Sequence, residues 1–312
     1  MIRRLAPALL AMAALATLGC GAGAGQQAGD VQLIVTRDFG SRELLRVDAP
    51  EQGGDDTVMR VLQRNADVKT RYGGGFVQSI DGLAGGTEGG RPVDWFYFVN
   101  GVEAEKGATS TNVDPGEQIW WDRRDWSAAQ RVPAVVGSFP EPFKTGIDGK
   151  RLPVRIECSD VKAKACDAVA DIFTKLGVVA ARGTLGAAET EDTLRVVVGP
   201  WKDIQQFTFV ARQVAKGPKV SGVFARFADG GDTLITLNAQ GRPVQRLGAA
   251  TGLVAAGREG EDAPTWLVTG TDAAGVDSAV TALDESALQE KFALAISNGR
   301  GVALPEQERR VP

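Results

Sequence analysis

Aromatic and amide side chains that could recognise a ligand gather in one short segment of the 312-residue chain. Residues 94–126 hold four of the six tryptophans and one of the two tyrosines. Such side chains bind flat apolar molecules by shape and meet polar groups with hydrogen bonds, without making or breaking covalent bonds. The candidate ligand-binding residues in this segment are Trp95, Tyr97, Asn100, Trp120 and Trp121.

The residue types that most catalytic and metal sites need are missing from the sequence. There is no histidine, which excludes Ser-His-Asp and Cys-His nucleophilic sites, imidazole-bound zinc or iron, and direct imidazole ligation of cobalt. No glycine-rich phosphate loop, calcium loop or pair of metal-binding cysteines is found. A net charge of -4 and no block of Lys or Arg argue against nucleic acid. We expect no enzyme and no covalent cofactor or metal; carboxylate catalysis is the least favoured alternative.

Two predicted strands position the aromatic side chains. Residues 95–99 are typical of a strand that ends in an Asn-Gly turn, and residues 119–121 are typical of a second strand. Alternation places Trp95 and Tyr97 on one face and Phe98 on the other. One face cannot bury this much aromatic surface. The remainder must be covered by another domain, a partner protein or a ligand.

These strands close a predicted first domain at residues 31–126. Its single helix among several strands suits a small mixed sheet packed on that helix, the β-grasp arrangement. The charges of both signs at residues 122–125 predict a solvated, mutually paired patch. The other elements predicted here are strands at 31–36, 43–47 and 76–80, a helix that begins near Thr57, and a mobile polar loop at 81–91.

A linker at residues 127–150 and a second domain at residues 151–306 follow. The linker contains three prolines and several apolar anchors, which predicts an ordered segment. In the second domain, strands alternate with helices, which indicates an α/β layer fold of unknown function. The fold class is therefore α+β, with a β-grasp-like domain followed by an α/β layer domain. Helices are predicted at 160–176, 203–215, 274–283 and 287–297.

The N-terminus predicts export. Residues 1–20 resemble a lipoprotein signal peptide: two arginines precede an apolar stretch that is too short to span a membrane, and Thr-Leu-Gly-Cys resembles a bacterial lipobox. Cys20 would then carry the lipid, on the outer face of the bacterial cell membrane. The alternative is an ordinary signal peptide in which Cys20 occurs by chance. Residues 21–30, rich in Gly, Ala and Gln, are predicted to form a flexible tether.

Two further cysteines, Cys158 and Cys166, lie eight residues apart in the second domain. In an exported chain this spacing favours one disulfide between a strand and the following helix. The alternative is two buried free thiols.

The first domain resembles the transcobalamin-like C-terminal domain family. The resemblance covers most of residues 31–122 and rests on five pieces in order: VQLIVTRDFG, TVMRVL, GGGFVQSIDG, WFYFVNG and GATSTNVDPGEQIWWD. It implies a β-grasp fold, and it implies a cobalamin-type corrinoid as a ligand that would be recognised by shape and hydrogen bonding. Composition and spacing by themselves show no corrinoid.

Two functions are therefore expected. In the first, a cell-surface lipoprotein binds a small molecule, such as a corrinoid, and delivers it to a membrane transporter. In the alternative, a non-enzymatic envelope protein packs its aromatic strands on a partner protein or on its own second domain. Solvent exposure of the four candidate aromatic side chains distinguishes them: complete burial within the chain removes the observation that motivates the first.

Overall fold

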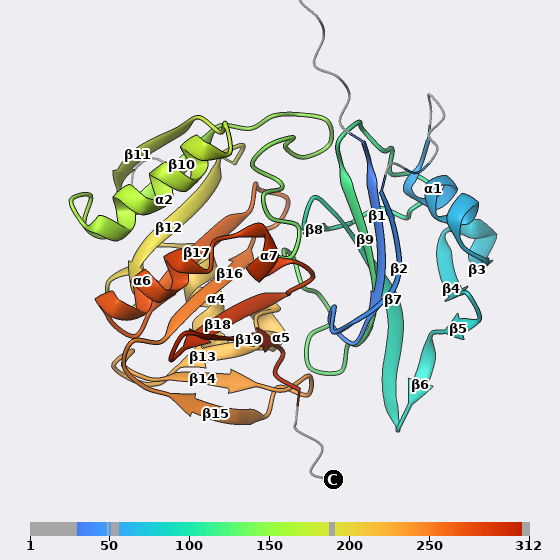
Figure 1. The fold of residues 1–312 in the computed structure, drawn as a ribbon. Coiled ribbons are helices and arrows are strands. Elements are labelled where there is room, and N and C mark those ends of the chain that lie inside the picture. The colour runs from blue at the N-terminus through green and yellow to red at the C-terminus, as the bar shows by residue number, and fades with distance from the viewer. Residues whose placement is uncertain (1–29, 49, 51–55, 187–190, 308–312) are drawn as a thin grey trace, which may run out of the picture.

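Two mixed β-sheets, one in each half of the chain, lie side by side in the computed structural model (Figure 1). The structure describes residues 30–48, 50, 56–186 and 191–307. The predicted signal peptide with Cys20, and the predicted tether up to residue 29, lie outside the described residues. Within the described part, no helix has both the length and the apolar character needed to cross a membrane.

The first half is a β-grasp domain. Its main sheet has the order β2-β1-β9-β7-β6, with β8 paired to β7, and its first and last strands, β1 and β9, run parallel at the centre. The elements in chain order are β1 (Gln32–Arg37), β2 (Arg42–Asp48), α1 (Val58–Asn65), β3 (Val68–Arg71), the short 3-10 helix η1 (Tyr72–Gly74), β4 (Phe76–Ile80), β5 (Leu83–Ala84), β6 (Gly86–Glu88), β7 (Arg91–Val99), β8 (Val102–Glu103) and β9 (Gln118–Asp125).

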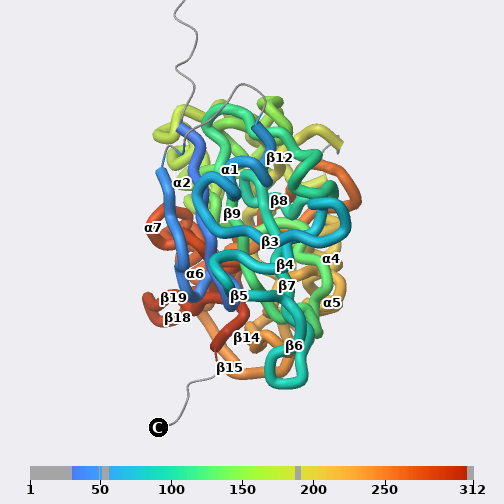
Figure 2. Tube along the Cα trace, turned by 90° about the vertical axis from the view of Figure 1, so that its right-hand side faces the viewer, coloured from blue at the N-terminus to red at the C-terminus, as the bar shows by residue number. Residues whose placement is uncertain are grey.

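Helix α1 and the small sheet β3-β4-β5 cover the outer face of this main sheet (Figure 2). The Thr57 side chain accepts a hydrogen bond from the backbone N–H of Arg60 at 3.3 Å and so caps the start of α1. Val58, Val61 and Leu62 lie on the buried side of α1 and join a core with the outward-facing side chains of β1, β7 and β9.

The loop predicted at residues 81–91 is partly ordered into strands, so that prediction was wrong. Strands β5 and β6 lie within this range, and β6 pairs with β7. Gly89 and Gly90, both at positive φ, make the tight turn between β6 and β7. These glycines, which predict mobility in the sequence, form the turn of the β6–β7 hairpin.

The second half contains a seven-stranded sheet of order β11-β10-β12-β17-β16-β18-β19. The first four strands of this order run parallel and the remaining pairs are antiparallel. The elements are β10 (Val154–Cys158), α2 (Lys164–Lys175), β11 (Ala180–Thr184), β12 (Leu194–Pro200), α3 (Trp201–Ile204), α4 (Phe209–Lys216), α5 (Pro218–Ser221), β13 (Ala225–Phe227), β14 (Leu234–Leu237), β15 (Pro243–Leu247), β16 (Gly252–Gly257), β17 (Thr265–Gly270), α6 (Ala273–Thr281), α7 (Glu285–Leu288), β18 (Ala293–Ser297) and β19 (Arg300–Leu304).

The central strands of this larger sheet carry apolar side chains on both faces. Each face must therefore be covered by another layer of the structure. Val196 and Val198 of β12 pack with α2 and α6, whereas Val197 packs with α3, α4 and the small sheet β13-β14-β15. The two covering layers are visible on either side of the sheet in Figure 1.

Two of the predicted helices in this half differ from the structure. The helix predicted at 287–297 is wrong for its second part, because Ala293–Ser297 forms β18, the strand next to the edge strand β19 of the sheet. Asn298 and Gly299, both at positive φ, turn β18 into β19. The helix predicted at 203–215 is divided into α3 and α4.

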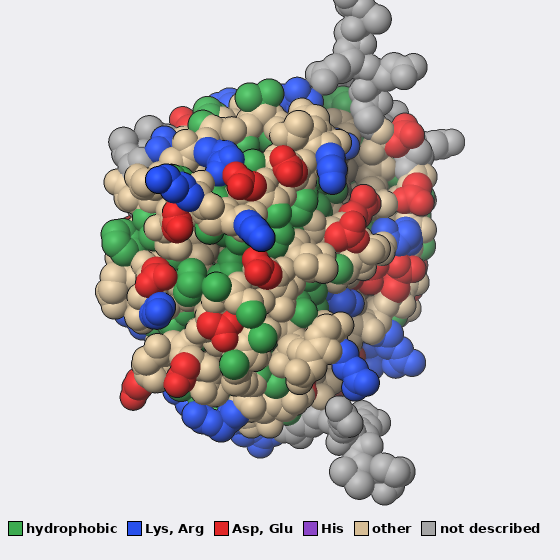
Figure 3. All heavy atoms as spheres, turned by 60° about the vertical axis from the view of Figure 1, so that its left-hand side comes forward, with side chains coloured by type: hydrophobic (Ala, Val, Ile, Leu, Met, Phe, Trp, Pro, Cys, Tyr) green, Lys and Arg blue, Asp and Glu red, His purple; other side chains and the backbone are tan. Residues whose placement is uncertain are grey.

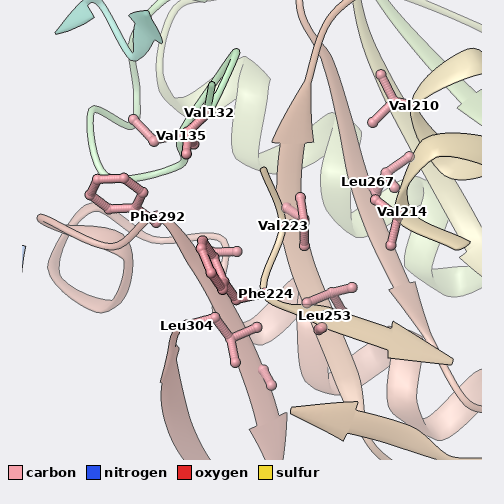
Figure 4. Close-up of a cluster of buried hydrophobic side chains, with 14 of the residues drawn as sticks. Val132, Val135, Val210, Val214, Val223, Phe224, Leu253, Leu267, Phe292 and Leu304 are labelled. Atoms are coloured by element: carbon pink, nitrogen blue, oxygen red, sulfur yellow. The ribbon is translucent and has the colours of Figure 1, made fainter. Parts of the chain in front are cut away.

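The linker packs both in the cluster between the two sheets and in the core of the second domain. Val132 and Val135 pack in the cluster between the two sheets, where they lie with Phe224 and Phe292 (Figure 4). The aromatic anchors of the linker, Phe139 and Phe143, pack instead in the core on the other face of the larger sheet.

Cys158, at the end of β10, and Cys166, in α2, form a disulfide, with their Cα atoms 6.1 Å apart. Both side chains are buried, so the disulfide fixes the helix to the strand inside the core.

Candidate functional site

Strands β7 and β9 divide the aromatic candidates between two faces, in line with strand alternation. Trp95, Tyr97 and Trp121 point into the core beside α1, with exposed fractions of 6%, 8% and 2%. Trp120 is fully buried on the opposite face. Of the three covers expected for this aromatic surface, the chain itself supplies one on both faces, which removes the observation that motivated a ligand there.

The second domain covers the Trp120 face. The ring of Phe292, in the segment before β18, lies 5.3 Å from Trp120 and 5.6 Å from Phe98. Phe39, in the turn between β1 and β2, lies 5.1 Å from the same ring. The indole Nε1 of Trp120 donates to Thr36 Oγ1 at 2.8 Å. Trp120 is therefore held by contacts within the chain and has no exposed surface, and it lines neither of the two cavities described below.

Asn100 is occupied by the chain as well. It adopts the left-handed conformation of the turn after β7, with φ of 51°. Its Nδ2 donates to Thr145 Oγ1 at 3.0 Å and to the Gly146 carbonyl at 2.9 Å, and its Oδ1 accepts from the Gln118 N–H at 2.9 Å. The amide thus fastens the linker to the β7–β8 turn instead of facing a ligand.

Trp95, Tyr97 and Trp121 meet at a cavity of about 410 Å³, which we call the aromatic cavity. The other residues of its wall include Phe76, Ala108 and Arg131. Three of the original five candidates are therefore brought together at one cavity, and Asn100 and Trp120 are not.

Two of these three aromatic side chains have a hydrogen-bond partner for their polar atom, and the third has none among the described residues. Trp95 Nε1 donates to the Leu83 carbonyl at 3.0 Å, and the Tyr97 hydroxyl lies 2.6 Å from the Lys106 carbonyl, to which it donates. The indole Nε1 of Trp121 is buried and has no hydrogen-bond partner among the described residues. A buried donor without a partner costs free energy, so a hydrogen-bond acceptor placed at Trp121 Nε1 would stabilise the protein.

A second cavity, of about 430 Å³, lies at the junction of the two domains, and we call it the junction cavity. The segment Glu103–Lys106 lines both cavities and so separates them. The wall of the junction cavity is formed by three parts of the chain: the β-grasp domain, the linker and the second domain. Representative residues are Val99, Asp114, Asp148, Lys150, Arg258 and Glu261.

Carboxylates dominate one part of the wall. The Asp114 backbone N–H donates to Glu117 Oε2 at 2.9 Å. Burial and, to a smaller extent, the negative charges of Asp114 and Asp148 together raise the pKa of Glu117 to about 7, against the lowering effect of hydrogen bonds from backbone N–H groups. Burial also lowers the pKa of Arg258 below its ordinary value, against the attraction of Glu105. Charges of both signs therefore border a partly desolvated space.

Glu103, which lines both cavities, belongs to a buried ion pair. Arg124 Nη2 donates to Glu103 Oε1 at 2.9 Å, and the guanidinium lies 3.8 Å from the centre of the Phe96 ring. Glu103 Oε2 accepts from the Val132 N–H at 3.0 Å. Arg124 is completely buried, so the prediction of a solvated patch at residues 122–125 was wrong.

Asp122 is buried in the same strand and fixes the β1–β2 turn. Its carboxylate accepts from Thr36 Oγ1 at 2.5 Å and from the backbone N–H groups of Phe39 and Gly40, both at 3.0 Å. Burial raises the pKa of Asp122 to about 6, and these hydrogen bonds act in the opposite direction. Asp122 thereby places Phe39 at the interface between the domains.

Metal and nucleic-acid sites find no support in the described residues. No group of three or more Cys, Asp or Glu side chains in this part of the chain has the arrangement to hold a metal ion. On the face of the molecule shown in Figure 3, positive and negative side chains are interspersed with apolar ones. The positive side chains on this face form no broad patch that would suit a polyanion.

Comparison with known proteins adds a family match for part of the chain. Residues 55–124, which lie within the β-grasp domain, match the family described as "Domain of unknown function (DUF4430)". No curated protein matches the chain. Among solved structures, one described as "a putative metal binding protein" from Ruminococcus gnavus is 14% identical, with a TM-score of 0.26. The match covers 31% of this chain and 97% of that one, and it is too distant to bear on the site.

Proposed function

We propose that this protein is an exported, lipid-anchored binding protein that holds a small molecule in the junction cavity. The single observation that carries this proposal is that three parts of the chain build the wall of one cavity. Ligand sites occur preferentially at domain interfaces, with volumes of about 300–1,000 Å³. The cavity of about 430 Å³ falls within that range.

The wall favours a small ligand that carries a positive group together with an acidic or polar one. Asp114 and Asp148 offer acceptors for the positive group, and Arg258 offers a donor for the other. Val99 and Leu152 supply apolar contact for the body of the molecule. Lipidation at Cys20 would hold this cavity at the cell surface, where a captured molecule could be passed to a membrane transporter.

A cobalamin-type corrinoid is the specific ligand that the transcobalamin resemblance supports. Burial of Trp120 and Asn100 removes two of the contacts first considered for it. A corrinoid would have to meet the molecule at the openings of the two cavities, beside the shared segment Glu103–Lys106. Isothermal titration with cyanocobalamin tests this version, and an absence of heat at micromolar concentrations would reject the corrinoid while leaving other ligands open.

The general proposal is tested by native mass spectrometry of the folded chain after incubation with the low-molecular-weight fraction of spent growth medium. We expect an added mass that persists through desalting. Ser110→Trp fills the junction cavity from its exposed rim and should abolish the added mass. Ser41→Trp adds the same bulk at an exposed turn outside both cavities and should retain it. An unchanged mass in the wild type, or equal retention in both variants, would contradict the proposal.

A further inference from the structure

Strand β7 has an open stretch on its outer edge. On its inner side, β7 pairs with β9 from Val93 to Val99. On its outer side, β6 pairs only as far as Val93, and β8 pairs only from Phe98 onward. Among the described residues, no strand continues the ladder between these two points.

The direction of the backbone groups in this stretch follows from the strand period. The Tyr97 carbonyl accepts from the Ala104 N–H at 3.1 Å, so the backbone of Tyr97 faces the outer edge. Because orientation repeats every two residues, the N–H and C=O of Trp95 face the same edge. No strand of the described residues pairs with Trp95 at this edge.

The aromatic cavity lies along this open stretch. Its wall takes residues 95–97 from β7, residues 75–77 at the start of β4, and Gln130 and Arg131 from the linker. Trp121, next to Tyr97 across the ladder, brings the buried indole N–H that has no acceptor. The carbonyl groups of an occupant could accept hydrogen bonds from Trp121 Nε1 and from the backbone N–H of Trp95.

Two exposed aromatic rings stand at the rim. Phe76 is 38% exposed and lines the cavity, and Tyr72 is 86% exposed, with its ring 6.2 Å from that of Phe76. The glycines between them, of which Gly73 and Gly74 are at positive φ, let the segment turn at this place. Exposed aromatic rings beside an unpaired strand edge are a combination that suits contact with another polypeptide.

We propose that this stretch of β7 receives an extended segment of a partner protein, which adds to the sheet as a short strand. Its main chain pairs with the outward N–H and C=O of Trp95, and one of its apolar side chains occupies the aromatic cavity. Main-chain pairing supplies the affinity in this mode of recognition, and the pocket for a side chain supplies the specificity. Strands β6 and β8 limit the added strand to a few residues.

A capped peptide, acetyl-Thr-X-Thr-X-Thr-amide with X as Leu, Phe or Val, is the probe. Amide chemical shifts of the full chain are followed by nuclear magnetic resonance during titration. We expect saturable shifts at Trp95, Tyr97 and Trp121 Nε1, with a preference among the three apolar residues. N-methylation of the central amides of the peptide should weaken binding at least tenfold, because it removes main-chain pairing.

A matched pair of glycine substitutions locates the site. Gly75→Phe adds a ring at the wall of the aromatic cavity without backbone strain, since Gly75 has φ of -77° and only the Tyr72 carbonyl within 4 Å of an added Cβ. Gly248→Phe adds the same side chain at an exposed position with nothing within 4 Å. The first variant should lose the shifts and the second should keep them.

Three results would overturn the inference: no saturable shift with any of the three peptides, equal binding of the N-methylated peptide, or shifts confined to the junction cavity. The N-methylated peptide decides the question even if Gly75→Phe folds poorly, because it leaves the protein unchanged. The inference is also independent of the small-molecule proposal, because Ser110→Trp closes the junction cavity without reaching the aromatic cavity wall.

Discussion

The indole of Trp120 meets the ring of Phe292 at a centroid distance of 5.3 Å and an interplanar angle of 76°, an edge-to-face contact between the two domains. Phe39 and Phe98 pack against the same ring of Phe292. Edge-to-face pairs add to the stabilisation from burial, so one side chain of the second domain organises the aromatic face of the first.

Truncation of Phe292 should therefore destabilise the whole chain. We expect Phe292→Ala to lower the free energy of unfolding by about 3–5 kcal/mol, as for other buried aromatic residues. Urea denaturation followed by tryptophan fluorescence measures this, with a red shift of emission as Trp120 becomes exposed. Phe207→Ala, at a half-exposed ring, is the control and should change stability by less than about 0.5 kcal/mol. A loss below 1 kcal/mol for Phe292→Ala would show that the interface is not organised in this way.

Neighbouring tryptophans should respond differently to the same substitution. Trp120→Phe removes a hydrogen bond to Thr36, whereas Trp121→Phe removes an N–H that has no acceptor among the described residues. Both side chains are buried, so the loss of volume is matched. We expect Trp120→Phe to cost about 1 kcal/mol more than Trp121→Phe in urea denaturation. Equal losses would indicate that Trp121 Nε1 has a partner in solution.

Removal of one member of the buried ion pair should strongly lower the stability of the folded chain. Glu103→Ala leaves the charge of Arg124 buried without its partner, which costs about 3–5 kcal/mol. Glu88→Ala removes a bridge to Arg123 in which the Glu88 side chain is 54% exposed, and such bridges contribute about 0–1 kcal/mol. Thermal unfolding of both variants provides the comparison, and similar melting temperatures would refute it.

Stability should fall as pH rises from about 4.5 to 7, in part because of Glu117. Burial raises its folded-state pKa to about 7, above the unfolded value of 4.5. The folded chain therefore binds more protons than the unfolded chain in this window, and the contribution is full below pH 4.5 and lost as pH passes 7.

Glu117→Gln should flatten this dependence by an amount on the order of 2 kcal/mol, because the amide does not titrate. The measurement is the difference between the free energies of unfolding at pH 5 and pH 8. Glu259→Gln, at an exposed site, serves as the control. If the wild type and Glu117→Gln lose stability equally over this range, Glu117 is not the group responsible.

Strand alternation and chain order predicted much of the fold because these signals are local. The α+β class is confirmed, and the separation of Trp95 and Tyr97 from Phe98 follows from the period of two. Ala293–Ser297 was misread as helix because a short apolar run has no period that distinguishes a buried strand from a helix.

The candidate site was harder to predict because its decisive contacts are distant in the sequence. The charged run around Arg124 predicts a solvated side chain, yet its partner Glu103 lies 21 residues earlier, in β8. Phe292, which covers Trp120, stands 172 residues later and carries no signal of its role. The Asp114–Glu117 pair had a weak signal, a Pro-Gly turn flanked by acids, that points to close approach but not to a cavity.

The packing of the linker determines whether the junction cavity can open and close. Val132 and Val135 are buried in the cluster between the two sheets, together with Trp120 and Phe292, while Phe139 and Phe143 fix the same linker in the core of the second domain. Hinge opening of the two domains would expose the cluster between the sheets to water, so the domains should move as one body. The junction cavity is then a preformed receptacle of fixed size, and its ligand must be selected by fit at the rim and not by closure around the bound molecule.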